Sequence, residues 1–312
     1  MMLPLPVLSV AGPSDPLPDF DLRFDYDRPE ASEAEFRRLL PAARASGNLD
    51  YLVQLLTQIA RAQGLQMKFD EAGRTLDEAE GALTGETRVA QVRLLLERGR
   101  VLNSSKLREE SKPYFREAWE LARLAKADAF AVDAAHMLGI VETAEVSADW
   151  HLKSIALAEA SDDPKALRWL GSLYHNLAWT RHDGGDPAAA LELFQKALSA
   201  RETEGDEKRI HVARWSVARA LRSLGRLDEA LRIQRRLLEE GPPDGYVHEE
   251  IAESLLARRE ETGAASHFAA AYRALCSDPW LMRDEPDRLE RMRLMGGVPR
   301  ADEAPPVDEA KP

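Results

Sequence analysis

The amino-acid sequence predicts an all-α solenoid of about six helix-turn-helix repeats with a capping helix at each end. Three observations support this prediction. First, one spacing pattern recurs along the chain: a small residue is followed by a second small residue twelve positions later, and by a bulky residue four positions after that. The units repeat every 34 to 40 residues. Within each unit, apolar residues follow the three-and-four spacing of amphipathic helices.

The composition indicates a folded protein and restricts its partners. Hydrophobic residues make up 44% of the 312 residues and charged residues 31%, which is typical of globular chains. The net charge of −12 argues against a nucleic-acid partner, because phosphates attract cationic surfaces. We expect no membrane partner, since no run of about 18 apolar residues occurs. A single cysteine, Cys276, excludes an internal disulfide and favours a cytoplasmic location.

The N-terminal region is expected to be separate from the repeats. Residues 1–29 are predicted to be disordered or extended, and residues 30–46 to form a capping helix. Within the first region, "DFDLRFDYD" (19–27) alternates apolar and acidic residues with the period of two that is typical of a strand. This segment either lies in the groove or against the first helices and competes with partners, or it only packs its aromatic residues on the N-terminal cap.

Residues 47–276 are predicted to form the six repeats. The small residues of the first helices are Ala60, Gly99, Gly139, Ala178, Ala218 and Ala252. Their counterparts on the second helices are Ala72, Ser111, His151, Ala190, Ala230 and Ala264. Helices that cross closely have no room for large side chains at these positions. The bulky residues that fill the space beside them are Leu76, Phe115, Ile155, Phe194, Gln234 and Phe268.

Turn signals separate the two helices of each predicted pair. They include "GGDP" at 184–187, "LGRLD" at 224–228 and "TG" at 262–263. Asp186 is a suitable N-cap, and Pro187 suits the first helical position. After the last pair, residues 277–297 are expected to form a capping helix with Trp280, Leu289 and Met292 turned inward. Residues 298–312 are expected to be a disordered tail.

The repeat resembles the tetratricopeptide repeat, whose signature is W-x2-L-G-x2-Y, then A-x3-F, then P. The fourth unit carries the resemblance with Tyr174, Leu177, Ala178, Ala190 and Phe194. His151 and Gln234 depart from the signature, and the unit of about 40 residues indicates a long variety. The resemblance covers about residues 47–276. It implies a right-handed superhelix whose first helices line a concave groove that binds peptides.

Helix geometry places the positions six and three before each small residue, and one and four after it, on one stripe. With Asn176 added, the candidate groove residues are Arg61, Arg93, Arg100, Asn103, His136, His175, Asn176, Trp179, His182, Trp215, Arg219 and Arg222. Guanidinium groups favour bidentate contacts with carboxylates, and tryptophan provides an apolar anchor. We therefore expect a non-catalytic scaffold that binds an acidic peptide segment with an aromatic or aliphatic anchor.

Two details of this stripe leave alternatives open. In the sixth repeat the sign of the charge reverses, with Tyr246, Glu249 and Glu253, so a partner with one basic end is also compatible. The arginines can instead be solvated or paired within the chain, and Trp179 and Trp215 can serve only to pack neighbouring repeats. The sequence does not choose between a binding stripe and a structural one.

Two other classes of function compete with the scaffold. His175 and His182 are two helical turns apart, about 10 Å along the axis, which is too far to share one metal ion. A metal-dependent hydrolase would need His136 to converge on His175, and no motif of a known catalytic class is present. We therefore expect no catalytic residues, metal or cofactor. A peptide-responsive sensor that changes the curvature of its superhelix remains an alternative, and the oligomeric state is left open.

Overall fold

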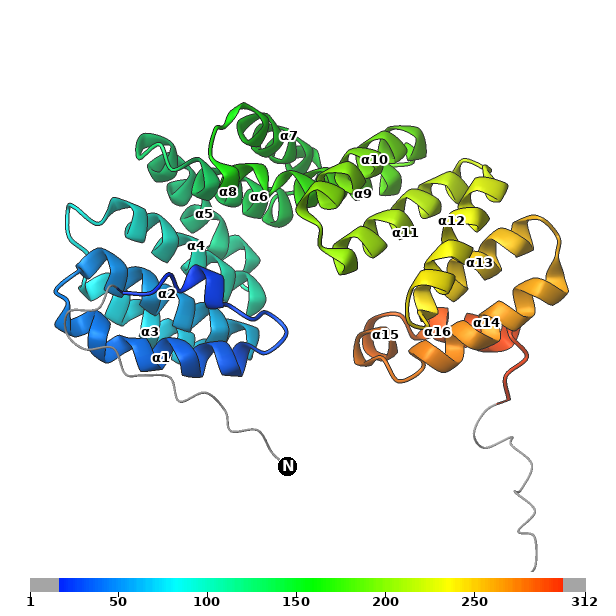
Figure 1. The fold of residues 1–312 in the computed structure, drawn as a ribbon, viewed down its shortest axis with the longest axis horizontal. Helices are drawn as coiled ribbons and strands as arrows, with labels where there is room; N and C mark the ends of the chain where they lie inside the picture. The colour runs from blue at the N-terminus through cyan, green and yellow to red at the C-terminus, as the bar shows by residue number, and fades with distance from the viewer. Residues whose placement is uncertain (1–16, 300–312) are drawn as a thin grey trace, which may run out of the picture. The chain divides into compact units, whose positions relative to one another are not determined.

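The computed structural model describes residues 17–299, and no strand occurs among them. A short 3₁₀ helix, η1 (Asp21–Arg23), precedes the α-helices. The α-helices run, in order, α1 (Pro29–Ala45), α2 (Leu49–Leu65), α3 (Phe69–Gly81), α4 (Arg88–Ser104), α5 (Arg108–Leu124), α6 (Asp128–Val141), α7 (Ala144–Ala160), α8 (Pro164–Leu167), α9 (Leu170–Asp183), α10 (Pro187–Glu204), α11 (Glu207–Ser223), α12 (Leu227–Glu240), α13 (Gly245–Ala257), α14 (Glu261–Leu275), α15 (Pro279–Asp284) and α16 (Pro286–Met295) (Figure 1). The predicted disordered ends lie largely outside the described residues.

The chain divides into two compact units, and the boundary falls within α9, between Leu173 and Tyr174. In unit 1, α1 packs on α2, and the pairs α2/α3, α4/α5 and α6/α7 follow, with α2 against α4 and α4 against α6. In unit 2, each helix from α10 to α13 packs on the helix that follows it, and α16 packs on α14. The predicted fold class, an all-α array of helix pairs with helical caps, is confirmed.

The small residues identified in the sequence lie where paired helices cross. All of them are buried, on α2, α4, α6, α9, α11 and α13 for the first helices. A Cβ atom added to Gly99 would lie 2.5 Å from the ring of Phe115, and one added to Gly139 would lie 2.5 Å from the ring of His151. Glycine is therefore a steric requirement at both crossings. At the second crossing, it compensates for a histidine at the position where other units have alanine or serine.

The bulky residues fill the cores beside these crossings. Phe115, Phe194 and Phe268 are fully buried, and so is Phe36 of the N-terminal cap. The core around Phe194 contains residues from α9, α10, α11 and α12, so it spans two consecutive helix pairs. Burial of each such ring stabilises the fold by about 1.5–3 kcal/mol. Because the pairs share their cores, none of them covers its apolar face alone.

A recurrent turn ends α2, α4, α5, α9, α11 and α13. Each has one residue at positive φ, between 53° and 84°: Met67, Lys106, Lys126, Gly185, Gly225 and Arg259. The next amide donates to the carbonyl five residues back, as in the Schellman motif. The predicted "GGDP" turn has this geometry, and the Asp186 carboxylate accepts from the amide of Ala189 at 3.0 Å.

Two local predictions near the C-terminus are wrong. The turn of the sixth pair lies at 258–260, so Thr262 and Gly263 are inside α14 rather than in a turn. The expected capping helix at 277–297 is divided into α15 and α16, since Pro286 begins a new helix and its ring nitrogen has no hydrogen to donate to α15. Together, α15 and α16 still close the last pair.

The orientation of α15 also differs from the prediction. Trp280 was expected to point inward, but it is 48% exposed, whereas Leu281 is fully buried. The carboxylate of Asp278 caps α15 by accepting from the amides of both residues, which fixes where the helix begins and which side faces the core. Leu289 and Met292 are buried as predicted.

The crossing at Gly99 can be tested against a glycine that meets no neighbour. We expect Gly99→Ala to lower the free energy of unfolding by about 1–3 kcal/mol, because the added methyl group overlaps the ring of Phe115. Gly73 lies inside α3 with nothing near its Cβ position, so Gly73→Ala should instead stabilise the protein by about 0.5–1 kcal/mol. Urea unfolding followed by circular dichroism measures both. Equal effects of the two substitutions would contradict the steric explanation.

Candidate functional site

The candidate groove residues lie on the first helices of both units. Those on α2, α4 and α6 form what we call the unit 1 face: Arg61, Arg93, Arg100, Asn103 and His136. Those on α9 and α11 form the unit 2 face: His175, Asn176, Trp179, His182, Trp215, Arg219 and Arg222.

On the unit 1 face, Arg61 and Arg100 are paired with carboxylates of the same chain. Both guanidinium groups contact Glu97, at 3.3 Å from Arg61 and 2.5 Å from Arg100. Arg100 also pairs with Asp133. Burial alone would lower the pKa of Arg100, but Asp133 and Glu97 outweigh it and raise that pKa above its ordinary value. Two cations therefore face two anions, and this part of the face carries no surplus charge.

Arg93, the third arginine of the unit 1 face, is paired with the N-terminal segment. Its guanidinium contacts the carboxylate of Asp21 at the start of η1, with the second contact at 3.3 Å, and donates to the side-chain oxygen of Gln54 at 3.1 Å. Arg93 is only 9% exposed. Residues 17–28 thus lie against the first helices of unit 1.

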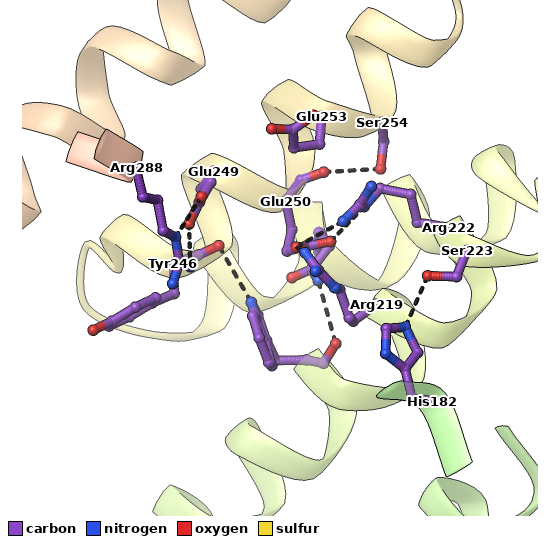
Figure 2. A network of polar contacts seen from close by, with 12 residues as sticks. His182, Arg219, Arg222, Ser223, Tyr246, Glu249, Glu250, Glu253, Ser254 and Arg288 are labelled. Atoms are coloured by element: carbon purple, nitrogen blue, oxygen red, sulfur yellow. Dashed lines mark hydrogen bonds and ion pairs between the residues drawn. The ribbon is translucent and has the colours of Figure 1, made fainter. Parts of the chain in front are cut away.

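On the unit 2 face, two arginines converge on one buried carboxylate (Figure 2). Arg219 and Arg222 both contact Glu250 of α13, and Arg222 Nε lies 2.8 Å from its Oε2. The Glu250 side chain is 1% exposed, whereas those of Arg219 and Arg222 are 30% and 20% exposed. Two cations share one anion, so this cluster carries one surplus positive charge that solvent can reach.

Two indole rings lie beside this cluster. The ring centroids of Trp179 and Trp215 are 6.1 Å apart, and Trp179 also contacts Phe194 edge-on at 5.1 Å. Both indole N–H groups have partners inside the unit: Trp179 donates to His175 Nε2 at 3.0 Å and Trp215 to the carbonyl of Tyr246 at 3.2 Å. Their ring faces are half-buried, which leaves apolar surface for contact.

The indoles and arginines line one pocket of about 450 Å³. Its other residues are Glu249, Glu253, Glu285 and Arg288. The acids that reverse the sign in the sixth repeat are paired here by α16: Arg288 holds Glu249 with contacts of 2.8 and 2.6 Å, and Arg291 holds Glu253. Arg288 also pairs with Glu285 at 2.9 Å, so three carboxylates face two guanidinium groups on this side of the pocket. A partner with one basic end therefore remains compatible.

The histidines do not form a metal site in the described part of the chain. No group of three or more potential metal-ligating side chains occurs among residues 17–299. His136 is in unit 1 beside His151 and Trp169, with ring centroids 6.3 and 5.2 Å away. Burial lowers the pKa of His136 to about 4; the carboxylate of Asp133 opposes this shift, and His151 and Arg100 add to it. Burial also lowers the pKa of His175 to about 4, and its Nε2 accepts from Trp179.

A serine and an aspartate flank His182 in an arrangement like that of a hydrolytic triad. His182 Nε2 lies 2.9 Å from Ser223 Oγ, and its Nδ1 lies 3.4 Å from Asp183 Oδ1. Hydrolysis also needs N–H donors for the developing oxyanion. The amides that follow the serine, those of residues 224, 225 and 226, already donate to helix carbonyls at 2.9–3.2 Å. Because these donors are occupied, the arrangement does not favour acyl transfer.

Comparison with known proteins agrees with the repeat geometry. A family model described as tetratricopeptide repeat matches residues 172–208, which cover most of α9, all of α10 and the turn between them. The match identifies one tetratricopeptide repeat, which α9 and α10 form. No curated protein is matched by its sequence. None of the helices in 17–299 is long and apolar enough to cross a membrane.

Several solved structures resemble this chain in fold. The apo form of RapI has a TM-score of 0.65 and 13% identity over 88% of this chain and 77% of that one. A tetratricopeptide repeat protein from Parabacteroides merdae has a TM-score of 0.50 and 15% identity, covering 87% and 98%. A Signal Transduction ATPase with Numerous Domains (STAND) protein with a tetratricopeptide repeat sensor, from Pyrococcus horikoshii, has a TM-score of 0.52 and 14% identity, covering 88% and 40%.

The stripe predicted from the sequence omits two of the carboxylates that pair with its arginines. Glu97 and Glu250 each lie two residues before the small residue of their first helix. This position is next to the predicted groove stripe but is not part of it. Both are at most 2% exposed. A glutamate at a position that helical periodicity assigns to the interior could have predicted these ion pairs, because a buried acid needs a cationic partner. Arg288 and Arg291, on the cap, gave no such signal.

The shared carboxylate predicts a specific pattern of stability. In Arg219→Met/Arg222→Met, the buried carboxylate of Glu250 loses both cations, so we expect the free energy of unfolding to fall by about 3–5 kcal/mol. Adding Glu250→Met removes the stranded charge and should recover most of that loss. Urea unfolding of the double and triple variants measures the difference. If the triple variant is no more stable than the double, the three side chains do not act as one cluster.

The lowered pKa of His136 predicts a loss of stability in acid. The unfolded chain takes up this proton near pH 6.5 and the folded chain only near pH 4. The contribution of the neutral ring is complete above pH 6.5 and is lost as pH falls towards 4. His136→Phe should reduce the fall in unfolding free energy across this range by up to about 3 kcal/mol. Urea unfolding at pH 7.0, 5.5 and 4.5 tests this, and an unchanged pH slope would contradict it.

Proposed function

We propose that this chain is a non-catalytic protein-interaction scaffold that binds an acidic peptide segment with an aromatic or aliphatic anchor on its first-helix faces. The observation that carries the proposal is the cluster on the unit 2 face. There, Arg219 and Arg222 share the single buried carboxylate of Glu250 beside two indole rings.

The charge of this cluster favours an acidic ligand. Both guanidinium groups keep part of their surface exposed, and together with Glu250 they carry one positive charge in excess. A carboxylate from a partner would balance that charge and accept charge-assisted hydrogen bonds. Desolvating the arginines is less costly than desolvating isolated ones, because Glu250 already neutralises half of their charge.

The indoles favour an apolar anchor next to that carboxylate. The N–H groups of Trp179 and Trp215 are satisfied within the unit, so a ligand meets mainly their ring faces. Aromatic side chains gain from offset or edge-to-face contact with such rings. The adjoining pocket of about 450 Å³ lies within the range of small-ligand sites and can admit one large side chain.

A peptide-responsive sensor is the second candidate. The STAND protein whose fold resembles this chain is described as having a tetratricopeptide repeat sensor. A sensor would change its shape when the peptide binds, and a scaffold would not. Small-angle scattering with and without a bound peptide separates the two functions, since only a sensor would show a changed scattering profile.

The proposal predicts which peptides bind. The test uses nine-residue peptides with Phe, Leu or Ser at the centre and either four Asp or four Lys on each side of it. Only the Asp-flanked Phe and Leu peptides should bind. We expect Kd values in the micromolar range, about −8 kcal/mol. Trp215→Ala and Arg222→Ala should each weaken binding at least about tenfold, a loss of about 1.4 kcal/mol. Fluorescence anisotropy of labelled peptides measures the affinities.

A control variant comes from the exposed side of the same unit. Arg236 lies on α12 and pairs with Glu240 at the surface, so Arg236→Ala changes the net charge equally without touching the pocket. It should leave affinity within about twofold, because an exposed charge outside the site is screened by salt. Lys-flanked peptides binding as tightly as Asp-flanked ones would overturn the proposal, and so would equal losses in Arg236→Ala and Arg222→Ala.

A further inference from the structure

The N-terminal segment 17–28 places an aromatic anchor on unit 1. Phe20 is 6% exposed and meets the rings of Phe36 and Tyr51 edge-on, with centroids 6.5 and 5.0 Å away. Phe24 packs against Phe36 at 5.5 Å. These rings cover the junction of α1 and α2, which contribute Phe36 and Tyr51. The segment therefore fills an apolar site with two of its own aromatic side chains.

The same segment places a carboxylate on the unit 1 face. Asp21 pairs with Arg93, whose guanidinium also lies over the ring of Phe20 at 5.4 Å. Arg93 is buried, and a buried guanidinium without a carboxylate is strongly unfavourable. Gln54 accepts one of its hydrogen bonds but brings no charge. The site around Arg93 therefore requires an acid, from this segment or from another chain.

Farther along, the segment covers a second arginine of the face. Arg61 lies over the ring of Tyr26, with its guanidinium carbon 5.5 Å from the centroid. Tyr26 itself is 59% exposed, and Leu22 is 81% exposed. "DFDLRFDYD" thus presents acids and aromatic rings to the face whose arginines, in the sequence, indicated an acidic ligand with an aromatic anchor. The ligand chemistry expected from the repeats is present within the chain.

The remaining links of the segment are few and mostly near solvent. Tyr51 donates from its hydroxyl to the carbonyl of Pro18 at 2.9 Å, and Arg23 pairs with Glu35 at 2.7 Å. Ser32 exchanges hydrogen bonds with the backbone of Asp25. Exposed ion pairs such as Arg23–Glu35 add little to stability. A competing segment that brings its own carboxylate and ring can replace the main contacts.

We propose that residues 17–28 are a displaceable occupant of the unit 1 face, and that a partner segment with an aromatic residue next to an acid displaces them. This inference extends the proposed function to a second, self-occupied surface. While the segment is bound, the face is closed, and the apparent affinity for a partner equals the intrinsic affinity multiplied by the fraction of molecules in which the face is open. The segment thereby makes binding at unit 1 conditional on its release.

The test supplies the segment from outside. The probe is a fluorescein-labelled peptide of residues 19–27, DFDLRFDYD, and the receptor is the full chain, either wild type or Phe20→Ala/Asp21→Asn. The variant should bind the probe about 10- to 100-fold more tightly, which corresponds to an occupied fraction of about 90–99% in the wild type. Adding Arg93→Met should abolish that gain. Leu22→Ala, which alters an exposed side chain of the same segment, should bind like the wild type.

A second measurement needs no substitution. Excess probe added to the wild type should accelerate hydrogen exchange of the amides in 20–28, because they leave the face, while a peptide of the same composition in scrambled order should not. If the folded double variant binds the probe no more tightly than the wild type and exchange in 20–28 is unchanged, the segment is a permanent part of the cap and the proposal is wrong.

The outcome is separable from that of the proposed function. Binding on the unit 2 face is assessed with acid-flanked peptides and Trp215→Ala, and substitutions in 17–28 do not touch that unit. Loss of unit 2 binding with a retained gain at unit 1 would reject only the proposed unit 2 site. The reverse result would reject only the displaceable segment.

Discussion

Within each unit, a helix pair has more apolar surface than it can cover alone, and stacking on the neighbouring pair covers the rest. The stacking works only where backbones approach closely, which is why Gly99 faces the ring of Phe115 and Gly139 faces that of His151. The requirement also fixes which sides of the first helices remain outside the core. The polar residues of both faces are positioned by a steric constraint of the interior.

The arginines on those faces illustrate how intrachain pairing changes the meaning of a charged stripe. Glu97 and Glu250 are deeply buried acids, and each collects two guanidinium groups from the surface. A second acid, Asp133, completes the balance in unit 1, but the cluster around Glu250 keeps one uncompensated charge. Under the proposed function, an external carboxylate would therefore bind at Arg219 and Arg222, next to the indoles, and not along all the repeats.

Much of the fold could be predicted from the sequence, because the spacing of small and bulky residues follows directly from helix crossing. The positions of Ala178, Ala190 and Phe194 are examples. Side-chain pairing could not be predicted in the same way, since Asp21 and Arg93 are 72 residues apart in sequence and meet only in the folded chain. Trp280 was misplaced because the rotation of a short helix depends on its first residue, here fixed by the Asp278 cap.

The anchorage of the N-terminal segment has a kinetic consequence. Its attachments at Pro18, Phe20, Asp21 and Asp25 lie within eight residues, on α1, α2 and α4. Loss of any one of them loosens its neighbours, so detachment is expected to be concerted rather than gradual. A ligand for the covered surface then waits for spontaneous opening, and its observed association rate levels off as ligand concentration rises. The height of that plateau reports how often the chain uncovers itself.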